Sequence, residues 1–286
     1  IEPGAQTSPR AMLKSLLEKE KVILAPGTYD ALSASIAKQA GFKALYMSGF
    51  GVSGALLAKP DIGLISASEM ITRASQIVDA IDKVPLIADG DNGYGGVHSV
   101  SRLVRAYERA GVSCIQLEDQ VIPKRCGHME NKEVVDIDEA RTKISAAVQS
   151  RNSDEFLIAA RTDSRATHGL DEALRRGESF LSVGADILFI EAPHSIEEMQ
   201  KIKSTFPDVP LIANMVEGGK TPELSTQEIE QLGFKIVLRP VTALLSAADT
   251  LRRCYSSLLD KSQTEQTPSM LSFDEYNKMI GLPDYE

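Results

Sequence analysis

The sequence predicts an α/β fold, a (β/α)8 barrel of the TIM type, on three observations. Eight short, nearly continuous apolar runs recur along the chain, and each is followed by a stretch with the apolar spacing of a helix. This alternation is typical of buried parallel strands joined by helices. A glycine stands where a helix C-cap belongs before four of the runs, at Gly41, Gly111, Gly184 and Gly233. The length of 286 residues also suits a barrel. A doubly wound open sheet is the competing architecture.

The predicted elements follow one another in regular order. Residues 1–9 are expected to form a loose arm and residues 10–19 a helix. The strands are expected at 22–25, 44–47, 86–88, 114–117, 157–160, 187–190, 211–213 and 236–238. The first strand should end before Pro26, and a long loop should follow the second. After that loop, Ser66 and Glu69 have the spacing of a capping box and predict the start of a helix.

The C-terminal tail departs from the repeat. The helix after the eighth strand is followed by residues 261–269, a polar stretch typical of a linker, and by a short helix expected from Ser272 to about Gly281. We therefore divide the chain into a catalytic barrel over 1–260 and a tethered C-terminal helix over 261–286. Because the eight units are already complete, this helix must pack on its own barrel or on a partner subunit.

The composition is that of a globular protein, with 43% hydrophobic and 25% charged residues. No apolar run reaches about 18 residues, so no membrane span is predicted. The net charge of −9 argues against a nucleic-acid partner. Three widely spaced cysteines without a C-x-x-C motif suit a reducing compartment, and we expect a cytoplasmic protein. A mitochondrial location is the alternative, because the chain begins at Ile1 and a targeting peptide could have been removed.

Polar residues cluster where the predicted strands end. Barrel enzymes build their active sites from these positions, so we expect convergence of Ser48, Asp61, Asp89, Asp91, Glu118, Arg161, Glu191, Asn214 and Arg239. Four of the acidic residues among these, Asp61, Asp89, Asp91 and Glu118, would repel one another without a cation. Oxygen ligands alone favour Mg²⁺, with Mn²⁺ as a substitute. The alternative is that acidic residues in a glycine-rich turn only cap helices.

The segment Lys124-Arg125-Cys126-Gly127-His128 places one thiol between two cations and an imidazole. Such a loop, just after a strand that ends in carboxylates, suits a site for an anionic substrate. The alternative is an ordinary surface loop with an isolated cysteine. Cys114 begins a strand and is expected in the core, and Cys254 is expected to be structural.

Two further side chains allow two interpretations each. Arg161 could hold a substrate carboxylate with two hydrogen bonds, or form a salt bridge with Asp163 or Glu191. Tyr46 could pack in the core or hold the substrate. His168 and His194 are expected in solvated loops.

With Asp89-Gly90-Asp91-Asn92-Gly93-Tyr94-Gly95 and the Cys126 segment together, the chain resembles the isocitrate lyase/phosphoenolpyruvate mutase superfamily, and the cysteine favours its lyase branch. The resemblance implies a barrel whose last helix is exchanged between subunits, usually in a dimer of dimers. It implies Mg²⁺ held directly or through water by Asp61, Asp89, Asp91 and Glu118. It assigns the reaction itself to Cys126, Tyr46, Arg161 and His128. Substrate contacts fall to Ser48, Gly49, Phe50, Lys124, Arg125, Gly127, Glu191, Asn214 and Pro240.

The reaction implied is cleavage of a carbon–carbon bond in a small di- or tricarboxylate that carries a 2-hydroxyl group, with Cys126 as general acid. We expect 2,3-dimethylmalate, giving pyruvate and propionate, ahead of 2-methylisocitrate, because Met215 and Val216 beside Asn214 are apolar. Residues 214–219 and 129–132 also depart from the pattern of the tricarboxylate-cleaving relatives.

Two other functions stay open. One is an oxaloacetate acetylhydrolase of the same superfamily. Such relatives place a serine hydroxyl near the end of strand eight, where this chain has Pro240, with Thr242 two residues further on. The other is a barrel that binds ligands without turning them over, which the presence of both acidic positions and the cysteine loop disfavours.

Overall fold

A computed structural model describes residues 8–127, 129, 131–259 and 270–285. Eight parallel strands form one sheet in the order β6-β5-β4-β3-β2-β1-β8-β7. A parallel bridge between Leu188 and Leu211 joins its two ends. The predicted barrel is confirmed, and the open sheet is excluded. The strands are β1 (Ile23–Thr28), β2 (Leu45–Met47), β3 (Leu86–Asp89), β4 (Cys114–Glu118), β5 (Leu157–Thr162), β6 (Ile187–Ile190), β7 (Ile212–Asn214) and β8 (Ile236–Arg239).

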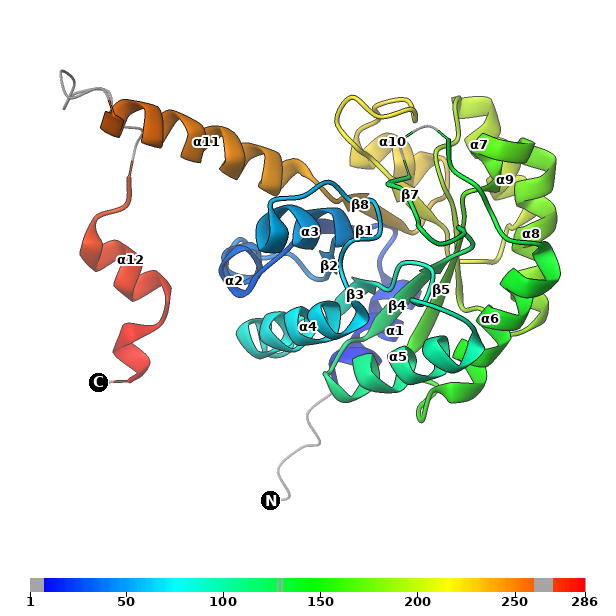
Figure 1. Cartoon of the computed structure of the whole chain (residues 1–286), viewed down its shortest axis with the longest axis horizontal. Helices are drawn as coiled ribbons and strands as arrows, with labels where there is room; N and C mark the ends of the chain where they lie inside the picture. The colour runs from blue at the N-terminus through cyan, green and yellow to red at the C-terminus, as the bar shows by residue number, and fades with distance from the viewer. Residues whose placement is uncertain (1–7, 128, 130, 260–269, 286) are drawn as a thin grey trace.

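Helices surround the strands (Figure 1). The predicted capping box is present, because the Ser66 side chain accepts from the Glu69 amide and Glu69 binds the Ser66 amide in return. The four glycines expected at helix ends all have φ between 81° and 98°, which favours glycine. The helices are α1 (Pro9–Lys19), α2 (Ala31–Gln39), α3 (Gly49–Leu57), α4 (Ala67–Ile81), α5 (Val97–Arg109), α6 (Ile137–Ser150), α7 (Ser164–His168), α8 (Leu170–Ser182), α9 (Ile196–Thr205), α10 (Thr226–Gln231), α11 (Thr242–Leu259) and α12 (Phe273–Met279), followed by the 3-10 turn Leu282–Asp284.

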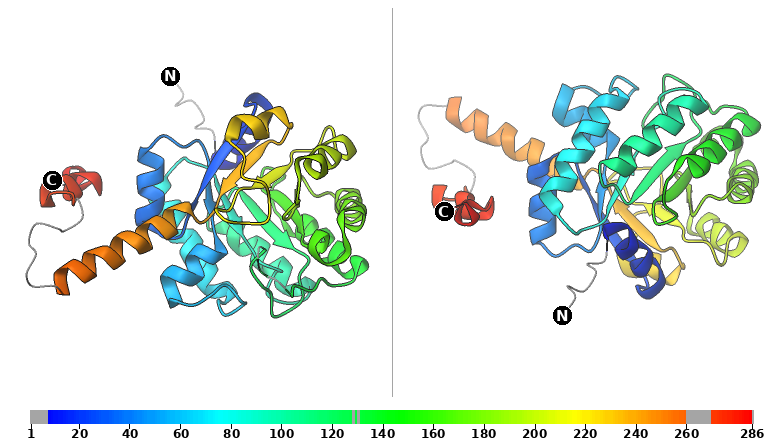
Figure 2. Two further views of the ribbon diagram at one scale, coloured as in Figure 1. Left: turned by 90° about the horizontal axis from the view of Figure 1, so that it is seen from above. Right: turned by 90° about the horizontal axis from the view of Figure 1, so that it is seen from below.

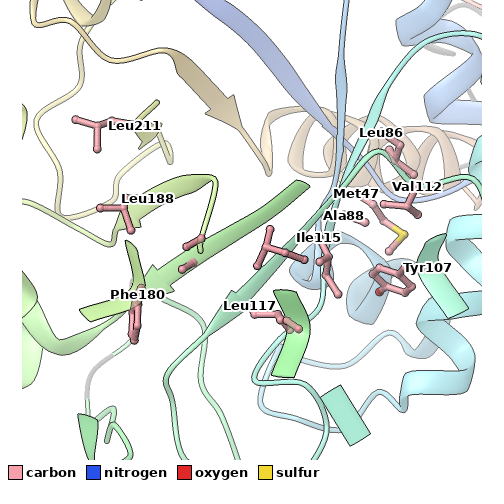
Figure 3. Close-up of a cluster of buried hydrophobic side chains, with 14 of the residues drawn as sticks. Met47, Leu86, Ala88, Tyr107, Val112, Ile115, Leu117, Phe180, Leu188 and Leu211 are labelled. Carbon is pink, nitrogen blue, oxygen red and sulfur yellow. The ribbon is translucent and has the colours of Figure 1, made fainter. Parts of the chain in front are cut away.

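The apolar side chains form two cores. One lies between the strands and the surrounding helices and includes Met47, Leu86, Ile115 and Tyr107 (Figure 3). The other fills the barrel interior and includes Leu13 of α1, whose side chain is fully buried. Helix α1 therefore covers the amino-terminal end of the barrel, which leaves the opposite end for a binding site.

Three local predictions are wrong. The segment expected to be a loop after β2 contains α3, whose three glycines weaken its helix propensity while Ser48 caps its first turn. Strand β1 does not end before Pro26 but continues to Thr28. Glycine at position 27 allows the strand to pass close to Pro240. A Cβ at this position would lie 2.0 Å from the Pro240 carbonyl oxygen. His168 ends the short helix α7 rather than lying in a loop.

Helix α11 projects outward from the end of the barrel (Figures 1 and 2). Helix α12 is linked to the barrel through α2, because the Gln39 side chain donates to the Met279 carbonyl at 2.9 Å. Helix α11 has no buried residue, and α12 has none either. The exposed apolar side chains in these helices and just before α12 include Leu251, Tyr255, Leu258, Leu259, Met270, Leu271 and Phe273. The predicted linker falls on residues outside the described part of the chain. Among the described helices, none has the length and apolar character to cross a membrane.

Candidate active site

The carboxyl ends of the strands surround a cavity of about 300 Å³. This volume suits a small ligand. Most of the residues predicted to bind or transform the substrate contribute to its wall: Tyr46, Ser48, Phe50, Asp61, Asp89, Lys124, Cys126, Gly127, Arg161, Glu191, Asn214 and Pro240. The barrel topology thus brings together residues that are scattered over nearly the whole sequence.

An acidic cluster lies at one side of the cavity. Asp89 and Glu118 end strands β3 and β4, Asp91 follows in the glycine-rich turn, and Asp61 precedes α4; each of the four is at most 5% exposed. The Asp89 carboxylate accepts hydrogen bonds from the backbone amides of Gly49 (3.1 Å) and Asp91 (3.0 Å). These bonds fix the cluster to the turns after β2 and β3.

The Lys124 ammonium lies inside this cluster, 2.7 Å from Asp61 Oδ1 and 2.6 Å from Asp91 Oδ1. Burial alone would lower the pKa of Lys124, but Asp91, Glu118 and Asp61 together raise it well above its ordinary value. Lys124 is therefore charged. Burial and the neighbouring Asp91 raise the pKa of Asp89 to about 6. Burial likewise raises the pKa of Glu118 well above its ordinary value, although the Arg161 guanidinium lies 3.5 Å from it, so Lys124 and Arg161 do not fully compensate the cluster.

The cluster has the donor chemistry of a Mg²⁺ or Mn²⁺ site, because all its ligand atoms are carboxylate oxygens. Glu118 Oε1 is buried and has no hydrogen-bond partner among the described residues. Within those residues, no three His, Cys, Asp or Glu side chains surround a common point as metal ligands do; Asp61 and Asp91 face the Lys124 ammonium instead. The chemistry of these donors fits a divalent cation, which would share the carboxylates with Lys124.

Arg161, at the end of β5, forms the second ionic centre. Its guanidinium makes two hydrogen bonds to Asp163, of 2.9 and 3.1 Å, and lies 3.3 Å from Glu191. Burial alone would raise the pKa of Asp163, but Arg161 and Lys132 hold it well below its ordinary value. Arg161 thus forms the salt bridges considered for it, and its side chain also lines the cavity.

Cys126 lies half-buried on the cavity wall. Its backbone amide donates to the Asp61 carbonyl at 3.2 Å, and its carbonyl accepts from the Met129 amide at 2.9 Å. The Gln120 side chain binds both the amide and the carbonyl of Arg125, at 2.9 and 2.8 Å. Cys114, by contrast, is fully buried in the barrel interior, where burial raises the pKa of its thiol far above the usual range. The core position predicted for Cys114 is confirmed.

Tyr46 combines the two roles considered for it. Its ring belongs to the barrel core and its side chain also lines the cavity. The hydroxyl donates to Gln116 Oε1 at 3.1 Å, and the Gln116 amide donates to Asp89 at 3.4 Å. Burial, followed by the charge of Asp89, raises the pKa of Tyr46 well above its ordinary value, so the hydroxyl keeps its proton.

Some expected residues do not reach the cavity. Arg125 is exposed, and the Arg239 side chain donates to the Leu224 carbonyl instead. Met215 packs in the core, whereas its neighbour Val216 lines the cavity. Gly49, Asp91 and Glu118 do not line the cavity either. His128 lies outside the described residues.

Several lining residues had no predicted role: Met129, Glu217, Gly218, Gly219, Val241 and Leu245. Glu217 follows the end of β7 by three residues, so the rule that barrel sites follow strand ends could have found it. Its carboxylate accepts a hydrogen bond from the Thr242 hydroxyl.

The protein is thus an eight-stranded barrel with an ionic cavity at the carboxyl ends of its strands. This is the position at which enzymes of the TIM-barrel class have their active sites. The family model described as phosphoenolpyruvate phosphomutase matches residues 13–259. The chain belongs to the phosphoenolpyruvate mutase/isocitrate lyase superfamily, as its motifs predicted.

Similar proteins include enzymes with different reactions. A 2,3-dimethylmalate lyase of Eubacterium barkeri is 45% identical over 273 residues, which cover 95% of this chain and 94% of the relative. The structure of an oxaloacetate acetylhydrolase with 3,3-difluorooxalacetate has a TM-score of 0.93 at 35% identity and covers 98% of this chain and 95% of its own. A crystal structure of 2,3-dimethylmalate lyase has a TM-score of 0.92 at 36% identity, with coverage of 97% and 93%.

A more distant structure contains a divalent cation. It is a phosphonopyruvate hydrolase in complex with oxalate and Mg²⁺, with a TM-score of 0.86 at 29% identity, covering 97% of this chain and 96% of its own.

Proposed function

We propose that the protein is a Mg²⁺-dependent carbon–carbon lyase that cleaves a methylated malate, with 2,3-dimethylmalate as the preferred substrate. The observation that carries this proposal is one cavity lined both by the cations Lys124 and Arg161 and by the apolar side chains of Val216 and Leu245. Cys126 lies on the wall of the same cavity. A dicarboxylate with methyl groups has the matching chemistry, and the similarity to a 2,3-dimethylmalate lyase supports the assignment.

The cation would be held by Asp89, Asp91, Glu118 and Asp61. The chemistry that Mg²⁺ supplies when bound is stabilisation of negative charge on the 2-oxygen and the adjacent carboxylate of the substrate. The protein's own groups orient the substrate. The Ser48 hydroxyl accepts from the Gly51 amide at 3.1 Å, which leaves its hydrogen for a substrate oxygen. Arg161 is fixed by Asp163, so its charge is preorganised at the cavity wall.

The reaction divides the substrate between C2 and C3. The 2-hydroxyl proton passes to solvent, the C2–C3 bond breaks, and pyruvate leaves with the new carbonyl group. The bonding electrons remain on the other fragment as the enediolate of propionate. The Cys126 thiol gives its proton to the C3 carbon and becomes a thiolate, which regains a proton from solvent when the products leave.

A tricarboxylate substrate is less well matched. A third carboxylate would need its own cation or donors, because a buried unpaired charge is costly. The described cations of the wall, Lys124 and Arg161, already bind protein carboxylates. Phe50, Val216, Val241 and Leu245 contribute apolar side chains to the same wall, and Glu217 adds a further carboxylate.

Hydrolysis of oxaloacetate is the second candidate, supported by the similarity to the acetylhydrolase structure. Pro240 lies on the wall at the end of β8 and has no donor group, and the Thr242 hydroxyl is bound to Glu217. Product analysis separates the two reactions. Incubation with Mg²⁺ and 2,3-dimethylmalate should release pyruvate and propionate, identified by NMR, whereas release of oxalate and acetate from oxaloacetate at the higher rate would favour the hydrolase.

We also propose a homo-oligomer, a dimer of dimers, in which the C-terminal helices pack on another copy of the chain. Helices α11 and α12 bury none of their residues within one chain and expose many large apolar side chains, among them Tyr255, Leu258 and Phe273. Exposed apolar surface of this extent is typical of an interface.

A further inference from the structure

The two ends of the loop that carries Cys126 are hydrogen-bonded to each other. Gln120 and Val134 form an antiparallel bridge, the Val121 amide donates to the Glu133 carbonyl at 3.1 Å, and the Val135 amide donates to Asp119 at 2.9 Å. The chain between these contacts leaves the barrel end and returns to it. Cys126 therefore lies far from the two ends of the loop, where its position depends on contacts of the loop residues, such as the bond of its own amide to the Asp61 carbonyl.

Lys132 makes such a contact from the fixed end of the loop. Its ammonium donates to the Gly127 carbonyl and to Asp163 Oδ1, the latter at 2.7 Å. The Lys132 side chain is 1% exposed, so these two partners take the place of water around its ammonium. Asp163 uses its two oxygens to hold Arg161 as well. One carboxylate thus joins the Cys126 loop to the arginine of the cavity wall.

Gly127 also packs closely against the Arg161–Glu191 pair of the cavity wall. A Cβ at Gly127 would lie 2.4 Å from Arg161 Nη2 and 2.8 Å from Glu191 Cδ, closer than a side chain can approach. The peptide next to Cys126 is thus held between the Lys132 ammonium and the Arg161–Glu191 pair. A shift of Lys132 would free Gly127 and with it the thiol.

We propose that Lys132 is a positioning residue that sets the place of the Cys126 thiol relative to Arg161, through its shared bond to Gly127 and Asp163. The consequence for catalysis rests on the proposed lyase function, in which Cys126 protonates carbon. The positional effect itself does not rest on it. A displacement of about 1 Å at a proton donor costs on the order of 10²-fold in rate.

The test compares Lys132→Met with Lys235→Met, the matched control. Lys235 also donates to a backbone carbonyl, that of Glu20, but at the amino-terminal end of the barrel. Both changes are made in a Cys254→Ala background, in which Cys114 is buried and Cys126 is the thiol open to reagent. The readouts are kcat and KM for 2,3-dimethylmalate with Mg²⁺, the unfolding midpoint, and the rate of iodoacetamide labelling of Cys126 by mass spectrometry.

We expect Lys132→Met to lower kcat about 10²-fold with KM changed less than roughly threefold. Labelling of Cys126 should be at least about tenfold faster, because the loop opens more often. Lys235→Met should leave kcat, KM and labelling unchanged. If the wild-type protein does not cleave the malate but Lys132→Met still speeds labelling, the lyase assignment fails and the positioning role stands.

Labelling at the wild-type rate in Lys132→Met would overturn the proposal, whatever happens to kcat. If Lys132→Met does not fold, Lys132→Gln, which can still donate to one partner, is read by the same criteria. Failure of both variants to fold would assign Lys132 to stability alone and would also overturn the proposal.

Discussion

The Lys124 ammonium lies 2.6 Å from the Asp91 carboxylate, and both side chains are at most 4% exposed. The cysteine loop thereby contributes a cation to the acidic cluster of the barrel. Lys124 and Arg161, whose guanidinium lies 3.5 Å from Glu118, do not compensate all the carboxylates of the cluster, as the raised pKa values of Asp89 and Glu118 indicate. A divalent cation would relieve this imbalance, and the first prediction follows from it.

Removal of Asp91 should abolish activity without unfolding the barrel. We expect Asp91→Ala to lower kcat/KM for 2,3-dimethylmalate at least about 10²-fold, because metal-assisted charge stabilisation amounts to several kcal/mol. Steady-state kinetics with excess Mg²⁺ and thermal unfolding provide the measurement. Asp171→Ala is the control, since that carboxylate only pairs with Lys201 at the surface. Full turnover of the wild-type protein in excess EDTA would contradict the metal requirement.

The three cysteines should separate into one catalytic and two structural thiols. Cys126→Ala should lower kcat at least about 10²-fold, the usual loss for a general acid. Cys254→Ala should leave kcat nearly unchanged, and Cys114→Ala should affect stability rather than kcat, because Cys114 is fully buried in the barrel interior. The kcat values of all three variants are compared under the same conditions. Equal losses in the three variants would mean that Cys126 has no special role.

Asp163 should stabilise the fold to the same extent across the neutral and mildly acidic range. Its pKa in the folded protein is depressed, so its contribution is complete above the unfolded value of about 3.9 and is lost only as pH falls through the lower folded value. We expect Asp163→Asn to cost about 3–5 kcal/mol of unfolding free energy, because Arg161 and Lys132 lose a buried partner.

Denaturant unfolding at pH 5, 6 and 7 measures this cost. The exposed Asp154→Asn is the control and should change the unfolding free energy by less than about 0.5 kcal/mol. A cost of Asp163→Asn that already shrinks between pH 7 and pH 5 would be inconsistent with the depressed pKa.

The C-terminal helices should hold the oligomer together. The monomer has a mass of 31.0 kDa, and light scattering after size exclusion should give a multiple of it. Deletion of residues 268–286, or Leu258→Asp in α11, should lower that mass by removing apolar contact area. Ile196→Asp, on α9 across the barrel from α11 (Figure 1), is the control and should not change it. An oligomer of unchanged subunit number after the deletion would argue against the exchange of helices.

The fold was predictable because strand and helix periodicities are strong signals in a barrel. The eight apolar runs correspond to eight strands, and polar residues at strand ends are expected at the cavity. Asp89, Arg161 and Asn214 were found in this way, whereas Glu118 and Arg239 also end strands and do not line the cavity. Helix α3 was missed because glycines weaken its helical signal, although Ser48 caps it.

The arrangement of loop side chains was not predictable. Lys124 and Arg125 are adjacent cations, yet Lys124 is buried in the acidic cluster and Arg125 is exposed. An irregular loop has no fixed period, so the sequence does not say which of two neighbours points inward. The contact of Lys132 with Gly127 and Asp163 was not predictable for the same reason. It depends on how the loop folds back on itself.

The central claim, cleavage of a methylated malate, is tested most directly by kcat/KM for 2,3-dimethylmalate, 2-methylisocitrate and oxaloacetate at the same Mg²⁺ concentration. Each methyl group in an apolar pocket contributes only about 1–3 kcal/mol of discrimination. We therefore expect 2,3-dimethylmalate to exceed each competitor by about tenfold or more, with slow turnover of related malates. A kcat/KM for oxaloacetate about tenfold above that for 2,3-dimethylmalate would contradict the lyase assignment.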